Sequence, residues 1–218
     1  MHIIFITDLH NHFEALPLLP AADLLVVGGD FTQLGSREDL LRAVDRVAAL
    51  FPGFVAVGGN MDCPGADEIL RAAGHGLSLE KTFVCGEARM RGCGGGNASP
   101  FHTPFEWKDE DITPALEAVP DGEINIFVSH APAFATGADL IANGTHVGSA
   151  ALAAFLRRGT PLLHLCGHIH EAAGLHELPA GNGTVRIVNP GPFGEDGHYA
   201  DICLNDGKIT GLSLKKCR

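Results

Sequence analysis

The sequence lacks basic runs and long apolar runs, and each absence excludes a class of protein. Among its 218 residues, 15 Lys and Arg stand against 26 Asp and Glu, which gives a formal net charge of −11. Proteins that bind duplex nucleic acid neutralise many phosphates with basic side chains, so we expect no duplex partner. No apolar run approaches the roughly 18 residues that cross a bilayer, so we expect no membrane span.

The sequence also lacks paired cysteines, because none of its six cysteines forms a Cys-x-x-Cys motif. The apolar start at Met1 to Ile6 runs directly into Asp8 and His10, which is not the pattern of a secretory signal. We therefore expect reduced thiols and a cytoplasmic protein. A chain of this length buries about 70% of its unfolded surface and needs no disulfides to form a core. We expect one domain over residues 1–218, as a monomer or a homo-oligomer.

Five short apolar runs, each followed by a small or polar residue, predict the central strands. Continuous apolar runs of this length are typical of strands that are buried on both faces. The predicted strands cover residues 3–7, 24–27, 54–57, 124–128 and 162–166.

Helices are predicted between several of these runs. Ser36 followed by Asp39 is a helix-capping signature, and apolar residues then keep helical spacing as far as Leu50. Shorter helices are expected over residues 66–73 and 149–158. In the first half of the chain, strands and helices are therefore predicted to alternate, which is an α/β arrangement.

The C-terminal part changes to short strand-like segments. Gly181-Asn182-Gly183 and Asn205-Asp206-Gly207 have the composition of hairpin turns. The stretch from Gly92 to Trp107 is rich in Gly and Pro, and its length as a loop favours a functional role. The tail strands are expected near Leu175 and over residues 185–188, 199–204 and 209–214.

Side chains that can bind metal ions follow each of the five central runs. Ligands of open α/β sheets bind outside the carboxyl ends of the strands. Residues i and i+2 of an extended backbone point the same way, so each of the two pairs with this spacing is expected to converge. Two Asp, one Asn and four His are too many ligands for one tetrahedral zinc site. This number fits two divalent ions with a shared ligand. The candidates are Asp8, His10, Asp30, Asn60, His130, His168 and His170.

The order D-x-H, G-D, G-N, S-H-A-P and G-H-x-H resembles the calcineurin-like metallophosphoesterase superfamily. These motifs span residues 8–170, and smaller ones are similar to an archaeal and bacterial branch related to cyclic-nucleotide phosphodiesterases. The resemblance implies an α/β (α+β) fold, a four-layer αββα sandwich with two mixed β-sheets. The smaller motifs are Gly94-Gly95-Gly96-Asn97 with Pro104-Phe105-Glu106, His146-Val147-Gly148-Ser149 and Asn189-Pro190-Gly191-Pro192.

The resemblance also implies two divalent metal ions, such as Mn, Fe, Zn, Co or Ni, at one edge of the sandwich. It assigns one ion to Asp8, His10 and His170, the other to Asn60, His130 and His168, and Asp30 to both. The implied activity is hydrolysis of a small anionic phosphoester, a diester rather than a monoester, by a hydroxide that bridges the metals. Asp30, Asn60 and His130 are then catalytic residues as well as ligands.

One departure from the superfamily pattern concerns the leaving group. Met61 follows Asn60 where relatives often carry a histidine that is assigned to protonate the leaving group, and methionine cannot transfer a proton. His12 is the candidate replacement. Three further residues are candidates for substrate binding, namely Asn97, His102 and His146.

Two other functions stay open at this stage. The first is a catalytically weak scaffold on the same fold, which the absence of a histidine beside Asn60 would allow. The second is another metal hydrolase, although amidohydrolases and β-lactamase-like enzymes begin with a His-x-His motif rather than with Asp8-x-His10. Taken singly, Asp or Asn after a strand often caps a turn, but the ordered set with four histidines favours a metal site.

Overall fold

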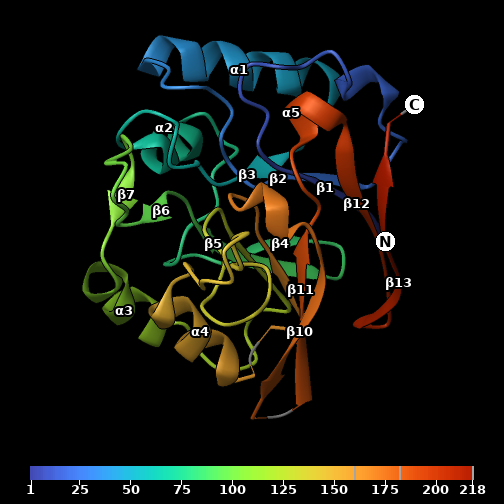
Figure 1. The fold of residues 1–218 in the computed structure, drawn as a ribbon. Helices are drawn as coiled ribbons and strands as arrows, with labels where there is room; N and C mark the ends of the chain where they lie inside the picture. Colours follow the sequence, from blue (N-terminus) through green and yellow to red (C-terminus); the bar gives the residue numbers. More distant parts are fainter. Residues whose placement is uncertain (160, 182, 218) are drawn as a thin grey trace.

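Two β-sheets lie face to face, with helices on the outer face of each, so the chain forms four layers (Figure 1). The computed structural model describes residues 1–159, 161–181 and 183–217. Both sheets are mixed, because each combines parallel central strands with antiparallel strands at an edge. The expected αββα sandwich is confirmed.

The first sheet has the strand order β13-β12-β1-β2-β3. Strands β1, β2 and β3 are parallel, and β12 pairs antiparallel with both β1 and β13. The Asn205-Asp206-Gly207 turn joins β12 to β13 as expected, whereas the turn predicted at Asn182 lies outside the described residues. The strands are β1 (His2–Ile6), β2 (Leu24–Val27), β3 (Val55–Ala56), β12 (His198–Asn205) and β13 (Lys208–Lys216).

The second sheet has the order β10-β11-β9-β8-β5-β4. Its central strands β11, β9, β8 and β5 are parallel, and the edge strands β10 and β4 are antiparallel to their neighbours. A small parallel pair, β6 (Gly96–Asn97) and β7 (Glu106–Trp107), lies apart from it. The strands are β4 (Phe83–Cys85), β5 (Ala88–Cys93), β8 (Ile126–Ser129), β9 (Leu163–Leu165), β10 (Gly174–Ala180) and β11 (Gly183–Asn189).

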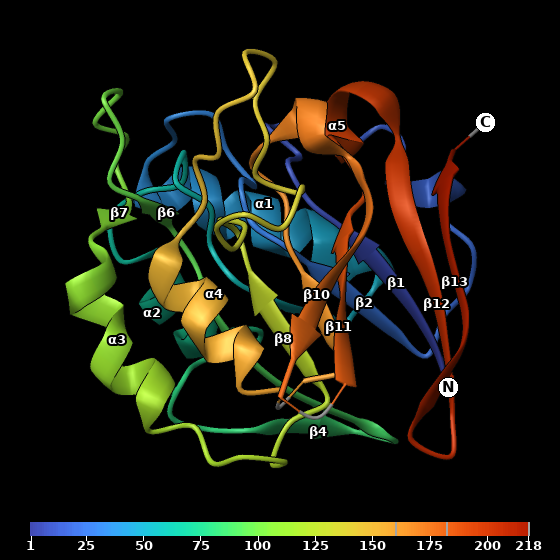
Figure 2. The same ribbon diagram turned by 60° about the horizontal axis from the view of Figure 1, so that its bottom comes forward.

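Helices α1 and α2 cover the first sheet, and α3 and α4 lie side by side over the second (Figure 2). The capping signature is confirmed: the Ser36 side chain accepts from the Asp39 N–H, and the Asp39 carboxylate accepts from the Ser36 N–H. Within the described residues, no helix combines the length and apolar character needed to cross a bilayer. The helices are α1 (Arg37–Leu50), α2 (Ala66–Ala72), α3 (Asp109–Glu117), α4 (Ala150–Arg157) and the short α5 (Phe193–Asp196).

Strand β1 shows why the central runs are continuously apolar. Ile4 and Ile6 pack into the cluster beneath α1, whereas Ile3 and Phe5 pack into the cluster between the two sheets. Alternate side chains of a strand point to opposite faces, so a strand between two apolar layers needs apolar residues at every position. A third cluster, which contains Phe127, fills the space between the second sheet and its helices.

The sequence did not predict α3, β4, β5, β6 or β7. Helix α3 contains Pro114 and buries little apolar surface, so its sequence shows no clear helical period. Strands β6 and β7 are two residues long each and lie inside the stretch from Gly92 to Trp107 that was expected to be a loop. Such short elements are formed by tertiary pairing and leave no periodic signal.

Candidate metal centre

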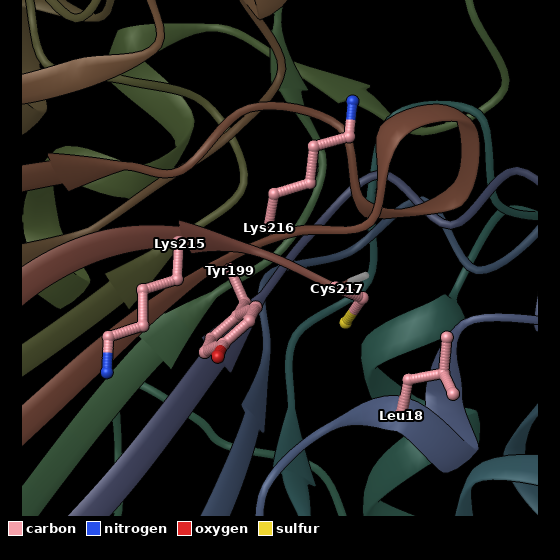
Figure 3. A pocket seen from close by; sticks show the side chains of 5 residues that line it. All are labelled: Leu18, Tyr199, Lys215, Lys216 and Cys217. Atoms are coloured by element: carbon pink, nitrogen blue, oxygen red, sulfur yellow. The ribbon is translucent and has the colours of Figure 1, made fainter.

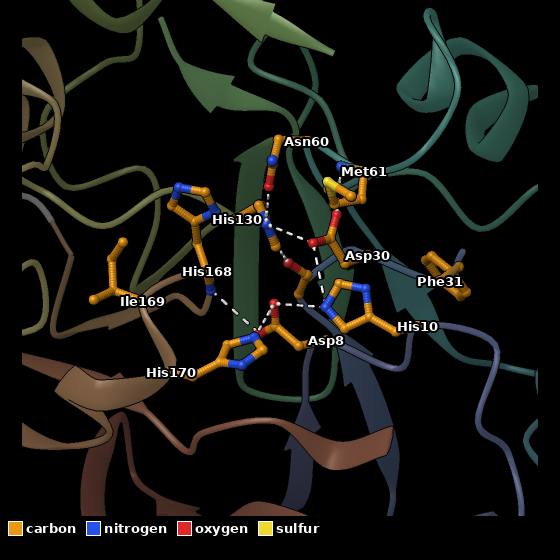
Figure 4. A network of polar contacts seen from close by, with 12 residues as sticks. Asp8, His10, Asp30, Phe31, Asn60, Met61, His130, His168, Ile169 and His170 are labelled. Carbon is orange, nitrogen blue, oxygen red and sulfur yellow. Dashed lines mark hydrogen bonds and ion pairs between the residues drawn. The ribbon is translucent and has the colours of Figure 1, made fainter. Parts of the chain in front are cut away.

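The predicted ligands lie together at one edge of the sandwich, where strands of both sheets end (Figure 4). Asp8 follows β1 and Asp30 follows β2, while His130 follows β8 in the second sheet. Asn60 follows β3, and His168 and His170 follow β9. Because parallel strands of each sheet end at this edge, residues far apart in sequence converge there.

Asp8, His10 and His170 form the first group. The Nε2 atoms of His170 and His10 lie 3.2 Å and 3.8 Å from Asp8 Oδ1. One ligand atom from each residue falls within 4.8 Å of the others, which is a spacing that one metal ion can bridge. The first group therefore has the composition and geometry of a metal site.

Asp30, His130 and Asn60 form the second group, which Asp8 also approaches. His130 Nε2 lies 3.3 Å from Asp30 Oδ2 and 2.8 Å from Asn60 Oδ1. The other nitrogen of this ring, Nδ1, lies 2.9 Å from the Gly28 carbonyl oxygen. That carbonyl can only accept a hydrogen bond, so Nδ1 carries a proton and Nε2 faces the site.

Asp30 connects the two groups. Its Oδ2 lies 3.6 Å from His10 Nε2 in the first group and 3.3 Å from His130 Nε2 in the second. Its Oδ1 accepts a 2.8 Å hydrogen bond from the Met61 backbone N–H. The hydrogen bond fixes one oxygen and leaves the other between the two sets of imidazoles.

Four of the candidate ligands have a left-handed backbone. Asp8, His10, Asp30 and His168 have φ values of 57°, 46°, 52° and 70°. The i, i+2 pairs were expected to converge along extended backbone, and that reason is wrong: tight turns after the strands aim these side chains. A non-glycine residue in such a conformation costs roughly 1–3 kcal/mol and persists where the surroundings impose it, which is typical of functional sites.

Two buried atoms of the centre lack the hydrogen bonds that burial requires. Within the described residues, His10 Nδ1 has no hydrogen-bond partner, and Asp8 Oδ1 has only the ionic contacts of the His170 and His10 Nε2 atoms, at 3.2 Å and 3.8 Å. A buried carboxylate oxygen with so few partners is costly, and coordination of a cation would reduce that cost. Carboxylate, imidazole and amide oxygen are also the donors that Mn, Fe, Zn and Co accept. The residues present therefore fit divalent metal ions.

Burial and neighbouring charges act in opposite directions on the pKa values of Asp8 and His130. Burial opposes ionisation of Asp8, but His170, His130 and His10 outweigh it and hold the pKa of Asp8 well below its usual range. Burial likewise opposes protonation of His130, yet the Asp30 carboxylate raises the pKa of His130 to about 9. Burial, aided by the neighbouring His130, lowers the pKa of His168 to about 4, so the His168 imidazole is neutral at pH 7.

Comparison with known proteins gives the chain its family. A family model described as calcineurin-like phosphoesterase matches residues 1–172. The chain belongs to the calcineurin-like phosphoesterase family. The matched range contains all the candidate ligands of this phosphoesterase.

Several proteins are similar to this phosphoesterase. The uncharacterized protein MJ1162 of Methanocaldococcus jannaschii is 32% identical over 202 residues, with 88% of each chain covered. The crystal structure of TT1561 of Thermus thermophilus matches with a TM-score of 0.72 at 19% identity, over 100% of this chain and 99% of that one. A Haemophilus influenzae NAD nucleotidase matches with a TM-score of 0.54 at 13% identity, over 99% of this chain and 49% of that protein. At such low identity the two structural matches concern the fold alone.

A cavity of about 420 Å³ opens onto the candidate metal centre. Its lining includes His12 and Met61, the two residues singled out beside the ligand motifs. The His12 side chain is 59% exposed, and its Nδ1 lies 4.0 Å from Glu14. Gln33 and Glu195 also line the cavity, and no motif in the sequence pointed to either of them.

The three residues predicted to bind substrate are not among those that line this cavity. Asn97 Nδ2 donates to the Val147 carbonyl oxygen at 3.0 Å, and His146 Nδ1 lies 2.8 Å from the buried Asp139 Oδ1. His102 is exposed on the loop before β7. A role of these residues in substrate binding stays a prediction.

A larger cavity of about 730 Å³ lies beside the C-terminal strand β13 and shares no lining residue with the metal centre (Figure 3). Its two basic side chains are already paired, Lys215 with Asp201 at 2.7 Å and Lys216 with Asp196 at 2.8 Å. Each of these two ammonium groups therefore has a carboxylate beside it.

Asp62 connects the loop that carries Asp30 to the loop that carries Asn60. Its buried carboxylate accepts hydrogen bonds from the Thr32 N–H and hydroxyl at 2.8 Å each and from the Gly59 N–H at 2.8 Å. A longer bond of 3.3 Å comes from the Phe31 N–H. Asp62 thereby holds the loop that carries Asp30 against the loop that carries Asn60. Burial, together with the Asp30 charge, raises the pKa of Asp62 to about 6.

We expect Asp62→Ala to lower the free energy of unfolding by about 3 kcal/mol or more, because each buried donor left unpaired costs about 1–3 kcal/mol. Urea unfolding followed by circular dichroism measures this loss. Asp45→Ala, at an exposed position of α1, is the matched control and should leave stability unchanged. A loss below about 1 kcal/mol in Asp62→Ala would contradict the role we give to this carboxylate.

Proposed function

We propose that the protein hydrolyses small anionic phosphodiesters with two divalent metal ions. The observation that carries the proposal is the Asp30 carboxylate, whose Oδ2 lies 3.6 Å from His10 Nε2 and 3.3 Å from His130 Nε2. One oxygen facing two sets of imidazoles is the arrangement expected of a ligand shared by two ions. The family supports phosphoester hydrolysis as the reaction.

The ligand assignment combines the two groups with the resemblance to the family, which adds His168 to the second group. Asp8, His10 and His170 would hold one ion, and Asn60, His130 and His168 would hold the other, with Asp30 between them. Divalent ions bound there supply Lewis-acid activation of water and neutralise charge on the phosphoryl group. The two carboxylates offset only part of the charge of two such ions, so the centre favours an anion although the protein carries −11 overall.

The chain's own residues hold this centre in place. The Gly28 carbonyl orients His130, the Met61 N–H orients Asp30, and Asp8 Oδ2 accepts a 3.2 Å bond from the His168 N–H. Each contact fixes a ligand before substrate arrives, so the geometry does not have to be organised during the reaction.

The diester assignment is what the resemblance to cyclic-nucleotide phosphodiesterases implies, and the residue beside Asn60 adds a preference for good leaving groups. Met61 lines the cavity and cannot donate a proton, whereas positioned general acids typically contribute about 10²–10⁴-fold to rate. Without such an acid, substrates with good leaving groups react best. His12 is the cavity residue that can take over protonation, because its imidazole lies on the same lining.

We expect the rate to depend steeply on the pKa of the leaving group, because an unprotonated leaving oxygen must carry negative charge. The slope of the logarithm of the rate against leaving-group pKa is measured with a series of aryl phosphodiesters whose phenols differ in pKa. Bis-p-nitrophenyl phosphate should be the fastest substrate of the series. Met61→His should flatten the slope by placing an imidazole beside Asn60. A shallow slope in the native protein that steepens in His12→Ala would assign the proton to His12. A flat dependence in the native protein and both variants would contradict any role for protonation at this site.

The substrate class is tested by a screen of purified protein. Phosphodiesters and phosphomonoesters are compared in the presence of Mn, Ni, Co, Zn or Fe, after removal of bound metal. The proposal predicts hydrolysis of diesters with at least one of these ions and slower hydrolysis of alkyl monoesters. Faster hydrolysis of monoesters throughout the screen would replace the diester assignment.

A further inference from the structure

The stretch from Gly94 to Trp107 is attached to the loop that carries Asn60. The Gly95 N–H donates to the Gly58 carbonyl oxygen at 3.0 Å, and the Phe105 N–H donates to the Asn60 carbonyl oxygen at 3.1 Å. The Asn60 side chain also takes part, because its Nδ2 donates to Thr103 Oγ1 at 3.1 Å. Backbone and side chain of one candidate ligand are thus both held by this stretch.

Glu106 determines which way the Thr103 hydroxyl points. Glu106 Oε1 lies 2.7 Å from Thr103 Oγ1 and also accepts the Thr103 N–H at 2.8 Å. Burial opposes ionisation of Glu106, but the bonds from Ser99 and Thr103 lower the pKa of Glu106 to about 2. A carboxylate only accepts hydrogen bonds, so the single hydroxyl hydrogen of Thr103 is donated to Glu106.

That donation leaves Thr103 Oγ1 with lone pairs only on the side of Asn60. The end of the Asn60 amide that faces Thr103 must therefore be the NH₂ group. The opposite end, Oδ1, is then directed at His130 Nε2, 2.8 Å away. A reversed amide would present NH₂ to the metal centre, and an amide NH₂ has no lone pair to offer a cation.

We propose that Glu106 and Thr103 are positioning residues that orient the Asn60 amide with its oxygen toward the metal centre. The proposal rests on the proposed function, since it treats Asn60 as a metal ligand. Residues that orient a ligand in this way commonly change metal affinity about 10–100-fold when they are removed. The Gly- and Pro-rich stretch between β5 and β7 then acts as the outer support of one metal site.

Isothermal titration of metal-free protein with Mn²⁺ tests the proposal without any substrate. Thr103→Val keeps the shape of the side chain and removes the hydroxyl, so it should weaken binding of one of two ions about 10–100-fold. Thr103→Ser retains the hydroxyl and should restore the native affinity. Thr113→Val is the matched control, because the Thr113 hydroxyl donates to the Asp109 carbonyl within α3, and it should bind as the native protein does.

The titration separates this proposal from the proposed function. The proposed function is supported if the native protein binds two ions and the Asn60→Ala variant binds only one. If the Thr103→Val variant then binds both ions with native affinity, the positioning role alone is overturned. Native protein that binds fewer than two ions, or an Asn60→Ala variant that binds as tightly as the native protein, overturns both. If Thr103→Val does not fold, Thr103→Ala is read in the same way, because it also removes the hydroxyl that accepts from Asn60 Nδ2.

Discussion

Replacing Asp30 with asparagine is expected to reduce phosphodiester hydrolysis by at least about 10²–10³-fold, the loss that follows removal of one preorganised electrostatic group. The asparagine oxygen can still accept the Met61 N–H, which the native Oδ1 accepts at 2.8 Å. The NH₂ group then replaces Oδ2 between His10 and His130, so both ligand groups lose their shared negative oxygen. His130→Ala should be similarly inactive, because it removes the imidazole that contacts both Asp30 and Asn60.

The measurement is kcat/KM toward bis-p-nitrophenyl phosphate at saturating Mn²⁺, with circular dichroism to show that each variant is folded. Asp45→Asn makes the same chemical change at an exposed position of α1 and should keep native activity. A folded Asp30→Asn or His130→Ala protein that retains more than about a tenth of native activity would remove that residue from the mechanism.

Removal of metal by a chelator is expected to abolish hydrolysis, and addition of Mn²⁺ is expected to restore it. Binding to the folded state alone also raises stability, by about 2.7 kcal/mol at a hundredfold excess over the dissociation constant. The midpoint of thermal unfolding should therefore rise when Mn²⁺ is added to the chelated protein. Asp30→Asn should show little of this rise, because it lacks the shared ligand.

Metal affinity is also expected to increase with pH. The Asp30 carboxylate raises the pKa of His130 to about 9, so this imidazole is protonated at neutral pH in the metal-free protein. A metal ligand must lose that proton, and each proton displaced adds up to about tenfold in apparent affinity per pH unit below the pKa. Titrations at several pH values up to about 9 measure the slope. A pH-independent affinity, or full activity in excess chelator, would contradict metal ligation by His130.

The central strands were predictable because burial on both faces requires a continuous apolar run in the sequence. Strands β1, β2 and β3 of the first sheet, and β8 and β9 of the second, all follow from apolar runs between two packed layers. Helix α1 followed from its capping box and apolar spacing. Helix α3 was not predicted, because Pro114 lies inside it and is untypical of a helix interior. The strand pair β6–β7 was not predicted, because it is defined by tertiary contacts alone.

The convergence of the candidate ligands was predictable from the sequence, but the contacts that hold these residues were not. Asp, Asn and His residues that directly follow the parallel strands converge because these strands end at one edge of the sandwich. This rule can be applied to the sequence alone. The left-handed backbone at Asp8 and Asp30 and the bonds of Asp62 depend on packing between loops. The contact between Asn60 and Thr103 joins residues 43 positions apart, which no local pattern encodes.

Crystals of the protein loaded with Mn²⁺ and measured near the manganese absorption edge test the central claim most directly. The proposal predicts two anomalous peaks about 3.5–4 Å apart, the spacing of two-metal hydrolases. One peak should lie among Asp8, His10 and His170, the other among Asn60, His130 and His168, with the Asp30 carboxylate in contact with both. A single peak at full loading, or an Asp30 side chain turned away from the ions, would contradict the two-metal centre.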